Sequence, residues 1–180
     1  MVLTAEMAAG ETRGDRILRV DHAGEHGAVC VYAAQARIAR WRSPGAVAGI
    51  EHCLAHERRH RALFAAEIAR RGQRWCWSYA PCGVLGTTLG VVTGLLGPSA
   101  IAAATLGIER VVLCHLEDQM AKLATIDPAA VVVIAQIVAE EREHRDNASR
   151  EVRGLAAWLI APLVSAATEA VIWIGMRRPL

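Results

Sequence analysis

Several common functional signatures are missing from this 180-residue sequence. Its five cysteines are odd in number and include no C-x-x-C pair, which argues against a disulfide framework and favours a reducing compartment. The formal net charge of +2 gives no electrostatic case for a nucleic-acid partner. Strict alternation of apolar and polar residues is scarce, so no strand is predicted. The glycines between positions 83 and 97 do not form the G-x-G-x-x-G motif of a dinucleotide site.

Apolar residues are abundant instead. They make up 53% of the chain, the mean hydropathy is +0.25, and no charged residue occurs between positions 83 and 108. The length predicts a single domain spanning residues 1–180, and the pattern predicts an all-α fold. Residues 1–12 lack an apolar segment behind basic residues, so we expect no signal peptide.

The motif Glu141-x-x-His144 lies late in the chain on an apolar helical stripe that includes Ile137 and Val138. Residues three apart share a helix face, so this carboxylate and this imidazole point the same way, into the predicted core. A buried, unpaired carboxylate is costly, and a metal ion is the obvious compensating charge. One such motif is nevertheless a weak signal, because Glu and His are common on solvated faces.

A second copy makes the signal stronger. Glu57-x-x-His60 lies on another apolar stripe, and Glu25 and Glu109 occupy two more. Glu25 and Glu109 each lie 32 positions before the glutamate of the next Glu-x-x-His motif. Ser43-Pro44 and Asp127-Pro128, which are typical helix starts, each begin 14 positions before those glutamates.

This arrangement resembles that of the ferritin-like carboxylate proteins, in which two helices supply a Glu and two supply Glu-x-x-His. The predicted fold is therefore a ferritin-like four-helix bundle with additional apolar helices. Four glutamates with two neutral histidines carry four negative charges, which two divalent ions neutralise. Carboxylate and imidazole ligands suit iron or manganese, and the lack of a thiolate argues against structural zinc.

Helix boundaries follow from the caps and the apolar stripes. We expect four bundle helices: one from about Asp15 to Arg40, one from Ser43-Pro44 to Gly72, one from Gly97-Pro98 to about Ala124, and one after Asp127-Pro128. Residues 73–81 read as a loop, and the connection that follows is expected to hold a short helix. Close helix or lipid contact is the expected role of its glycines. A further apolar segment spans residues 155–176.

A family resemblance begins at Val20-Asp21-His22-Ala23-Gly24-Glu25-His26-Gly27-Ala28. With Glu57-x-x-His60, Ile108-Glu109 and Glu140-Glu141-Arg142-Glu143-His144, this stretch resembles the demethoxyubiquinone hydroxylase family, over roughly residues 17–178. The resemblance implies a di-iron site and O₂-dependent hydroxylation of a polyprenylated benzoquinol in ubiquinone biosynthesis, with an external reductant for which NADH is the family's suggested donor. It implies as ligands the residues already singled out: Glu25, Glu57, His60, Glu109, Glu141 and His144.

One position departs from the family pattern, which has a His-Tyr pair after the glutamate of the third bundle helix. Here the matching residues are His115-Leu116, so a tyrosine that could assist reduction is missing. Tyr32 and Tyr79 are the candidate substitutes.

Neighbouring polar residues have plainer interpretations. His52 and His56 are interleaved with arginines, so we interpret them as a partly solvated basic face rather than as ligands. Glu140 and Glu143 are expected to face water. Asp21, one turn before Glu25, is either an acceptor that orients a ligand imidazole or a solvated residue.

Three classes of function remain open. The leading one is a di-iron monooxygenase acting on a lipid-tailed quinol with O₂. A ferritin-like protein that oxidises iron or scavenges peroxide without an organic substrate is the alternative. A membrane-bound scaffold whose Glu and His residues pair with arginines is the third. Homo-oligomers and contacts with other ubiquinone-biosynthesis proteins are also left open.

We expect the protein to sit on a membrane surface without crossing it. A span needs about 20 apolar residues for a hydrocarbon core of about 30 Å. Gly97-Pro98 divides the uncharged stretch into pieces of about 21 Å and about 15 Å, too short to span. The apolar segment 155–176 is long enough, but Pro162 and Glu169 interrupt it, so we expect it to pack on the bundle. Arg70, Arg71, Arg74, Trp75, Trp77 and Tyr79 suit a membrane interface. The expected location is the cytoplasmic face of a bacterial inner membrane, with the matrix side of the mitochondrial inner membrane as the alternative.

Overall fold

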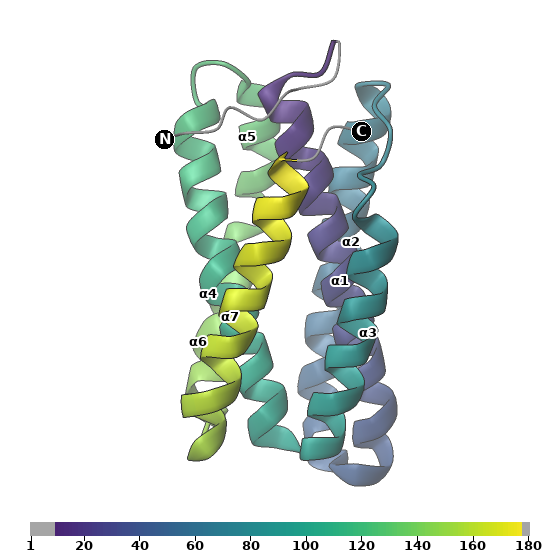
Figure 1. Ribbon diagram of the computed structural model, residues 1–180, viewed down its shortest axis with the longest axis vertical. Coiled ribbons are helices and arrows are strands. Elements are labelled where there is room, and N and C mark those ends of the chain that lie inside the picture. Colours follow the sequence, from purple (N-terminus) through teal and green to yellow (C-terminus); the bar gives the residue numbers. More distant parts are fainter. Residues whose placement is uncertain (1–9, 178–180) are drawn as a thin grey trace.

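A computed structural model shows an elongated bundle of nearly parallel helices and describes residues 10–177, apart from the side chains of Ala156 and Ala157 (Figure 1). The expectation about a signal peptide falls largely on residues 1–9, which lie outside the described residues. Within the described range there are seven α-helices, one 3₁₀ helix and no strand, which confirms the all-α class. The helices are α1 (Arg13–Arg42), α2 (Val47–Arg70), α3 (Tyr79–Leu96), α4 (Pro98–Leu123), α5 (Pro128–Ala135), α6 (Val138–Glu151) and α7 (Leu155–Arg177), and the 3₁₀ helix is η1 (Pro44–Ala46).

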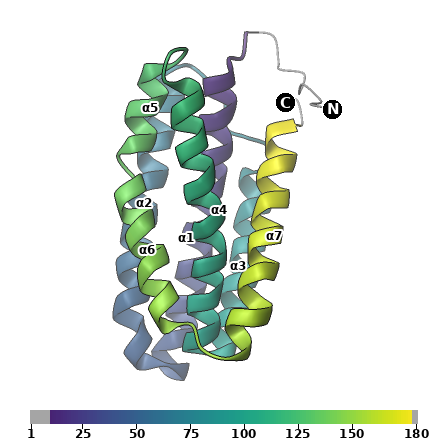
Figure 2. The ribbon, with the colours of Figure 1, turned by 90° about the vertical axis from the view of Figure 1, so that its left-hand side faces the viewer.

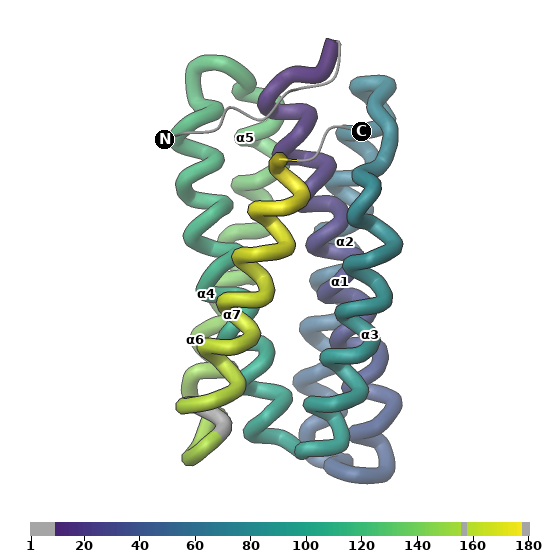
Figure 3. The backbone as a smooth tube through the Cα atoms, in the orientation of Figure 1, coloured from purple at the N-terminus to yellow at the C-terminus, as the bar shows by residue number. Residues whose placement is uncertain are grey.

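Local caps and breakers set several helix ends, but one predicted start is shifted: Ser43 makes no side-chain cap, and η1 precedes α2, which begins at Val47. Thr12 and Asp15 form a reciprocal capping box at the start of α1. Asp127 accepts a hydrogen bond from the backbone of Ala130 at the start of α5, and Pro128 takes the first helical position, where no N–H is needed. Gly97, at φ +101°, makes the sharp turn from α3 into α4, which Figure 3 shows at one end of the molecule.

The four-helix core consists of α1, α2, α4 and the α5–α6 pair, which confirms the ferritin-like bundle. The connection from α2 to α4 runs the length of the bundle as α3, so it contains a full helix of 18 residues rather than a short one. Tyr79, Ala80 and Pro81, predicted as loop, form its first turn, where proline is tolerated because the N–H groups have no helical partner.

The helix predicted after Asp127-Pro128 is interrupted between α5 and α6. At Gln136 and Ile137 the backbone N–H groups bond to carbonyls three residues back instead of four. The preceding run from Val131 to Ile134 is β-branched and therefore has a lower helix propensity. The tighter turn keeps both Ile134 and Ile137 completely buried in the core.

The two additional apolar helices lie outside this core. Helix α3 packs along α1, and α7 packs along α4. Figure 2 shows α3 and α7 on one side of the bundle, with α2, α5 and α6 on the other. The contact of α3 is close because a Cβ on Gly86 would collide with the carbonyl oxygen of Gly27, and one on Gly90 would collide with that of Val31. The expectation that these glycines permit close helix contact is confirmed.

One expectation about membrane spans is wrong. The length argument fails because α3 begins at Tyr79 and α4 continues to Leu123, so three helices are long and apolar enough to cross a membrane by length and composition: Tyr79–Leu96, Pro98–Leu123 and Trp158–Arg177. The C-terminal helix packs on α4, as expected, but only 17% of its most apolar segment, within residues 158–177, is buried. Trp158, Leu163 and Trp173 are among the side chains that it leaves exposed.

Candidate metal centre

Six buried side chains from four helices meet in the middle of the bundle. Helix α1 provides Glu25, α2 provides Glu57 and His60, α4 provides Glu109, and α6 provides Glu141 and His144. The most exposed of them is Glu25, at 6%. These are the six residues singled out from the sequence, and the structure brings all of them together.

The six side chains form two overlapping groups of possible metal ligands. One contains Glu25, Glu57, His60 and Glu141, and the other contains Glu57, Glu109, Glu141 and His144. In each group the donor atoms all lie within 4.8 Å of one another. Three carboxylates and one imidazole therefore surround each position, and Glu57 and Glu141 belong to both.

The two shared glutamates each turn one oxygen towards each imidazole. Glu141 places Oε1 2.8 Å from Nδ1 of His60 and Oε2 3.5 Å from Nδ1 of His144. Glu57 places Oε1 3.3 Å from Nδ1 of His144 and Oε2 3.8 Å from Nδ1 of His60. Each shared glutamate could therefore offer one oxygen to each of two cations.

Several of the donor atoms have no hydrogen-bond partner in the part of the chain that the structure describes, which also fits a metal site. Oε1 of Glu57, Oε2 of Glu141 and Nδ1 of both His60 and His144 are buried and make no hydrogen bond with the described residues. Buried polar atoms are nearly always satisfied, so a group of orphaned atoms that face one another requires an explanation. Oxygen and nitrogen donors without sulfur suit iron or manganese, and the cluster is compatible with metal binding.

The electrostatics of the cluster call for added positive charge. Burial and the nearby carboxylate of Glu57 raise the pKa of Glu25 well above that of an ordinary glutamate. Burial and Glu141 do the same to the pKa of Glu109. Burial by itself would lower the pKa of His60, but its contacts with Glu141, Glu25 and Glu57 outweigh this effect and raise that pKa. Divalent cations would let the carboxylates stay ionised and the imidazoles stay neutral.

The far nitrogen of each imidazole contacts a residue that sequence reasoning placed elsewhere. Nε2 of His60 lies 2.7 Å from Oε2 of Glu140, which also pairs with Arg59. Nε2 of His144 lies 3.1 Å from Nδ1 of His56. Glu140 keeps 27% of its side chain exposed, so it faces water only in part, and the prediction missed its contact with His60; His56 is 14% exposed, mostly buried rather than part of a solvated face.

Both of these residues immediately precede the glutamate of a Glu-x-x-His motif. His56 precedes Glu57 and reaches the histidine of the other motif, and Glu140 precedes Glu141 and does the same. The repeated spacing could have revealed these contacts. Where two antiparallel helices carry matched motifs, the residue before each glutamate lies next to the histidine of the facing motif. Such outer contacts hold a ligand ring in one orientation. His52 and Glu143 stay at the surface, about half exposed.

Asp21 plays neither of the two expected parts. Its Oδ1 accepts a hydrogen bond of 3.0 Å from Nε2 of Gln119 on α4, and it contacts no ligand imidazole. Its Oδ2 is buried and makes no hydrogen bond with the described residues. Burial raises the pKa of this carboxyl to about 7, against the opposing effects of Gln119 and His115.

An apolar cavity of about 450 Å³ reaches the cluster from the side of α3 and α7. Its walls come mainly from the apolar side chains of α1, α3, α4 and α7, including Leu85, Leu89 and Leu163. Glu25, Glu57, Glu109 and Glu141 also line it, and Asp21 and His115 are among its few other polar residues. The cavity therefore offers an apolar molecule a mostly apolar path to the carboxylates.

Comparison with known proteins places the chain in a family. The sequence profile described as "Ubiquinone biosynthesis protein COQ7" matches residues 12–175, nearly the whole chain. The chain belongs to the COQ7 family. The resemblance inferred from the motifs is thus confirmed.

Relatives in the COQ7 family are named as hydroxylases. A 3-demethoxyubiquinol 3-hydroxylase of Rhodospirillum rubrum is 35% identical over 167 residues, covering 91% of this chain and 77% of the relative. The NADPH-dependent 3-demethoxyubiquinone 3-hydroxylase, mitochondrial, of Mus musculus is 31% identical over 169 residues, with 91% and 77% covered. A 3-demethoxyubiquinol 3-hydroxylase of Variovorax paradoxus is 32% identical over 165 residues, with 87% and 73% covered. These names do not support the alternative of an iron-oxidising or peroxide-scavenging protein without an organic substrate.

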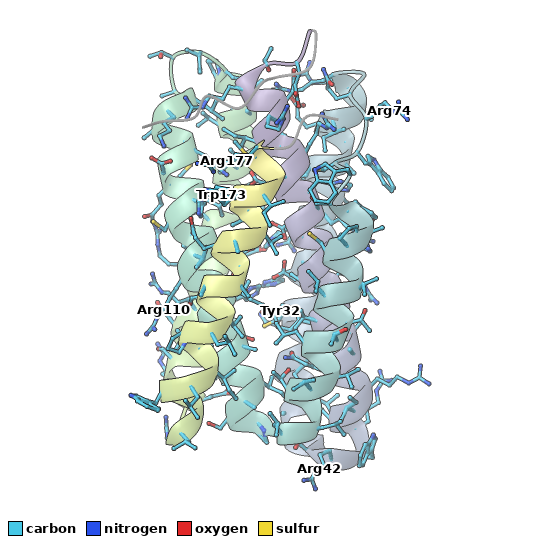
Figure 4. All side chains as sticks on the ribbon, in the orientation of Figure 1. Tyr32, Arg42, Arg74, Arg110, Trp173 and Arg177 are labelled. Carbon is cyan, nitrogen blue, oxygen red and sulfur yellow. The ribbon has the colours of Figure 1, made fainter. Side chains whose placement is uncertain are left out.

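The departure from the COQ7 pattern at Leu116 has a structural counterpart. Leu116 is 2% exposed, packs in the core and lines the cavity, while the adjacent His115 pairs with Glu169 of α7 at 2.8 Å. Tyr32 enters the cluster from α1, and Figure 4 shows it in the interior of the bundle. Its hydroxyl donates a hydrogen bond of 3.0 Å to Oε1 of Glu109. Tyr79 instead stacks on His26, away from the six carboxylate and imidazole residues.

Proposed function

We propose that this chain is a 3-demethoxyubiquinol 3-hydroxylase, a monooxygenase that uses O₂ to add a ring hydroxyl to a polyprenylated demethoxy-benzoquinol in ubiquinone biosynthesis. The observation that carries this proposal is the pair of overlapping carboxylate–imidazole groups at the inner end of an apolar cavity. The names of the relatives indicate which reaction is catalysed, and the apolar cavity suits a substrate with an apolar tail.

Two iron ions are the proposed cofactors. Glu25 and His60 would hold one, Glu109 and His144 would hold the other, and Glu57 and Glu141 would bridge both. Bound iron supplies the electrons that activate O₂ for insertion into a ring C–H bond. The chain's own contribution is to fix the ligands from four rigid helices, to orient both imidazoles through Glu140 and His56, and to keep bulk water out.

The external reductant is the second proposed requirement. The family resemblance suggests NADH, and the name of the mouse relative specifies NADPH. Both carry the same dihydronicotinamide ring and deliver two electrons as a hydride, and a monooxygenase needs two electrons for each O₂. Comparing the two donors at equal concentration in one turnover assay identifies the one that this chain accepts.

The exposed apolar side chains beside the cavity support a peripheral membrane location. Helices α3 and α7 expose several large apolar side chains, among them Val84, Leu96, Trp158 and Leu163. The same two helices line the cavity. A membrane span by α4 would carry Glu109 and Arg110 into hydrocarbon, at high cost. We propose that α3 and α7 rest in the interface of a membrane and receive the quinol from it, on the cytoplasmic face of a bacterial inner membrane or the matrix side of the mitochondrial one.

The deciding experiment supplies the iron-loaded protein with isotopically labelled O₂, a nicotinamide donor and a short-tail demethoxyquinol. We expect mass spectrometry to detect the hydroxylated quinol with one labelled oxygen atom. Iron oxidation without any quinol product, under every reductant tried, would refute the proposal. Profiling quinones in cells that lack the gene provides an independent check, because the demethoxy precursor should accumulate.

A further inference from the structure

The cavity contains one carboxylate that the metal centre does not use. Asp21 lies one helical turn before Glu25 on α1, a rise of about 6 Å along the axis. It lines the cavity, and Gln119 holds its Oδ1 through a hydrogen bond of 3.0 Å. Its Oδ2 is buried and has no hydrogen-bond partner among the described residues. An unpaired carboxylate oxygen in apolar surroundings is costly, which points to a ligand that supplies a donor.

The two redox forms of a benzoquinone differ at this point of contact. A quinol carries phenolic O–H groups, which donate hydrogen bonds, whereas a quinone carries carbonyl oxygens, which only accept. Oδ2 of an ionised Asp21 can only accept. It therefore stabilises a bound quinol and repels the carbonyl oxygen of a quinone.

We propose that Asp21, held in place by Gln119, binds a ring hydroxyl of the substrate and makes the cavity selective for the quinol over the quinone. This inference rests on the proposed function for the identity of the ligand. The contact would anchor the polar ring near Glu25 at the inner end of the cavity and leave the tail to the apolar side chains of α3 and α7. Burial raises the pKa of Asp21 to about 7, so the carboxylate is mostly ionised at pH 8.

The hydrogen bond from Gln119 permits a conservative test. In Asp21→Asn, Nε2 of Gln119 would donate to Oδ1 of the asparagine, as it donates to Oδ1 of Asp21. The asparagine nitrogen would then occupy the place of Oδ2 and present N–H donors to the ligand. Since the substitution is nearly isosteric, the acceptor becomes a donor with little change in packing. A quinone carbonyl should then be favoured.

The test is equilibrium dialysis at pH 8 with the Zn²⁺-loaded protein, because zinc has no redox chemistry and leaves both ligands unchanged. The probes are a short-tail demethoxyubiquinone and, under anaerobic conditions, its quinol. We expect wild type to bind the quinol at least about tenfold more tightly, as for a hydrogen bond to a charged group. Asp21→Asn should lose or reverse that preference, and Asp21→Leu should lose it mainly through weaker quinol binding.

Asp118→Asn is the matched control, since it removes an exposed carboxylate next to Gln119 that pairs with Lys122. It should keep the wild-type preference. A wild type that binds both forms equally or neither form, or an Asp21→Asn variant that keeps the wild-type ratio, would overturn the inference. Turnover is measured separately with the iron-loaded protein. Hydroxylation without an Asp21-dependent preference would refute this inference alone, and the preference without hydroxylation would refute the proposed function alone.

Discussion

The hydroxyl of Tyr32 donates a hydrogen bond to Oε1 of Glu109 across the interface of α1 and α4, at 3.0 Å. It contacts the carboxylate of only one of the two overlapping ligand groups. Tyr32 is 1% exposed, so no water replaces this donor easily. In a chain with Leu116 where the family pattern has tyrosine, this is the phenol that touches a proposed ligand.

Replacing Tyr32 by Phe should therefore weaken metal binding at the Glu109 position. Loss of a contact that orients a ligand typically lowers metal affinity about tenfold or more. The measurement is iron release to a competing chelator, followed for each of the two ions. Tyr79→Phe is the control, because that tyrosine stacks on His26 outside the six-residue cluster. Equal chelator resistance in Tyr32→Phe and wild type would contradict this prediction.

The shared glutamates predict an unequal response to the loss of a ligand. Glu57→Ala removes a donor from both groups, so elemental analysis should find less than one iron per chain. Glu25→Ala affects only one group and should leave the ion held by Glu109 and His144 largely in place. Glu51→Ala, at an exposed site on α2, should retain both ions. If Glu57→Ala retained both irons, the bridging assignment would be wrong.

Much of this centre was accessible from the sequence because its signals are local. Glu-x-x-His fixes two donors on one helix face, and Asp127-Pro128 fixes where α5 starts, whereas Ser43-Pro44 marks only the 3₁₀ turn η1 ahead of α2. The contacts of Glu140 and His56 were missed because they depend on how two helices are rotated against each other. The turn at Gln136 and the pairing of Asp21 with Gln119 likewise depend on packing between helices, which no pattern within one helix specifies.

An acidic cluster around Arg71 should make stability depend on pH. Arg71, at the end of α2, binds Asp127 at 2.6 Å and Asp15 at 3.1 Å, and so ties the starts of α5 and α1 together. The hydrogen bond from Arg71 lowers the pKa of Asp127, and that from Arg70 lowers the pKa of Glu67. Because these folded-state pKa values are depressed, the stabilisation is complete above the unfolded values near 4 and is lost as the pH falls through the folded values.

Chemical denaturation between pH 7 and pH 3 measures this dependence. Arg71→Leu should lower the free energy of unfolding at pH 7 by about 2 kcal/mol, between the values for exposed and buried pairs, and should flatten its fall with acid. Arg70→Leu should change the profile less, because its side chain is mostly exposed and, among the described residues, its ion pair is with Glu67 and with neither Asp15 nor Asp127. An acid profile that is parallel in Arg71→Leu and wild type would rule out this origin.

The glycine contact between α1 and α3 predicts opposite effects for one substitution at two sites. Gly86→Ala places a methyl group against the carbonyl oxygen of Gly27, so it should destabilise the protein by about 1–3 kcal/mol. Gly49→Ala on α2 meets open space and should stabilise it by up to about 1 kcal/mol through helix propensity. Thermal unfolding of both variants is the measurement. A neutral Gly86→Ala would mean that α3 does not pack this closely on α1.

Membrane association is the last prediction, and it tests the side of the bundle formed by α3 and α7. Trp75 and Trp77 precede α3 and are 55% and 38% exposed, and Trp158 on α7 is 76% exposed. Exposed indoles beside an apolar surface suit the interface of a bilayer. Wild type should float with anionic liposomes, and Trp75→Ala/Trp77→Ala and Trp158→Ala should each float less.

Trp41→Ala is the matched control, because Trp41 is 66% exposed but lies at the end of α1, outside α3 and α7. It should float like wild type. If all tryptophan variants lost flotation equally, the association would be a general effect of hydrophobicity rather than a property of this surface. Wild type that stays soluble with anionic liposomes would refute membrane docking. Resistance to both high salt and alkaline carbonate would instead show that at least one of the three long apolar helices crosses the bilayer.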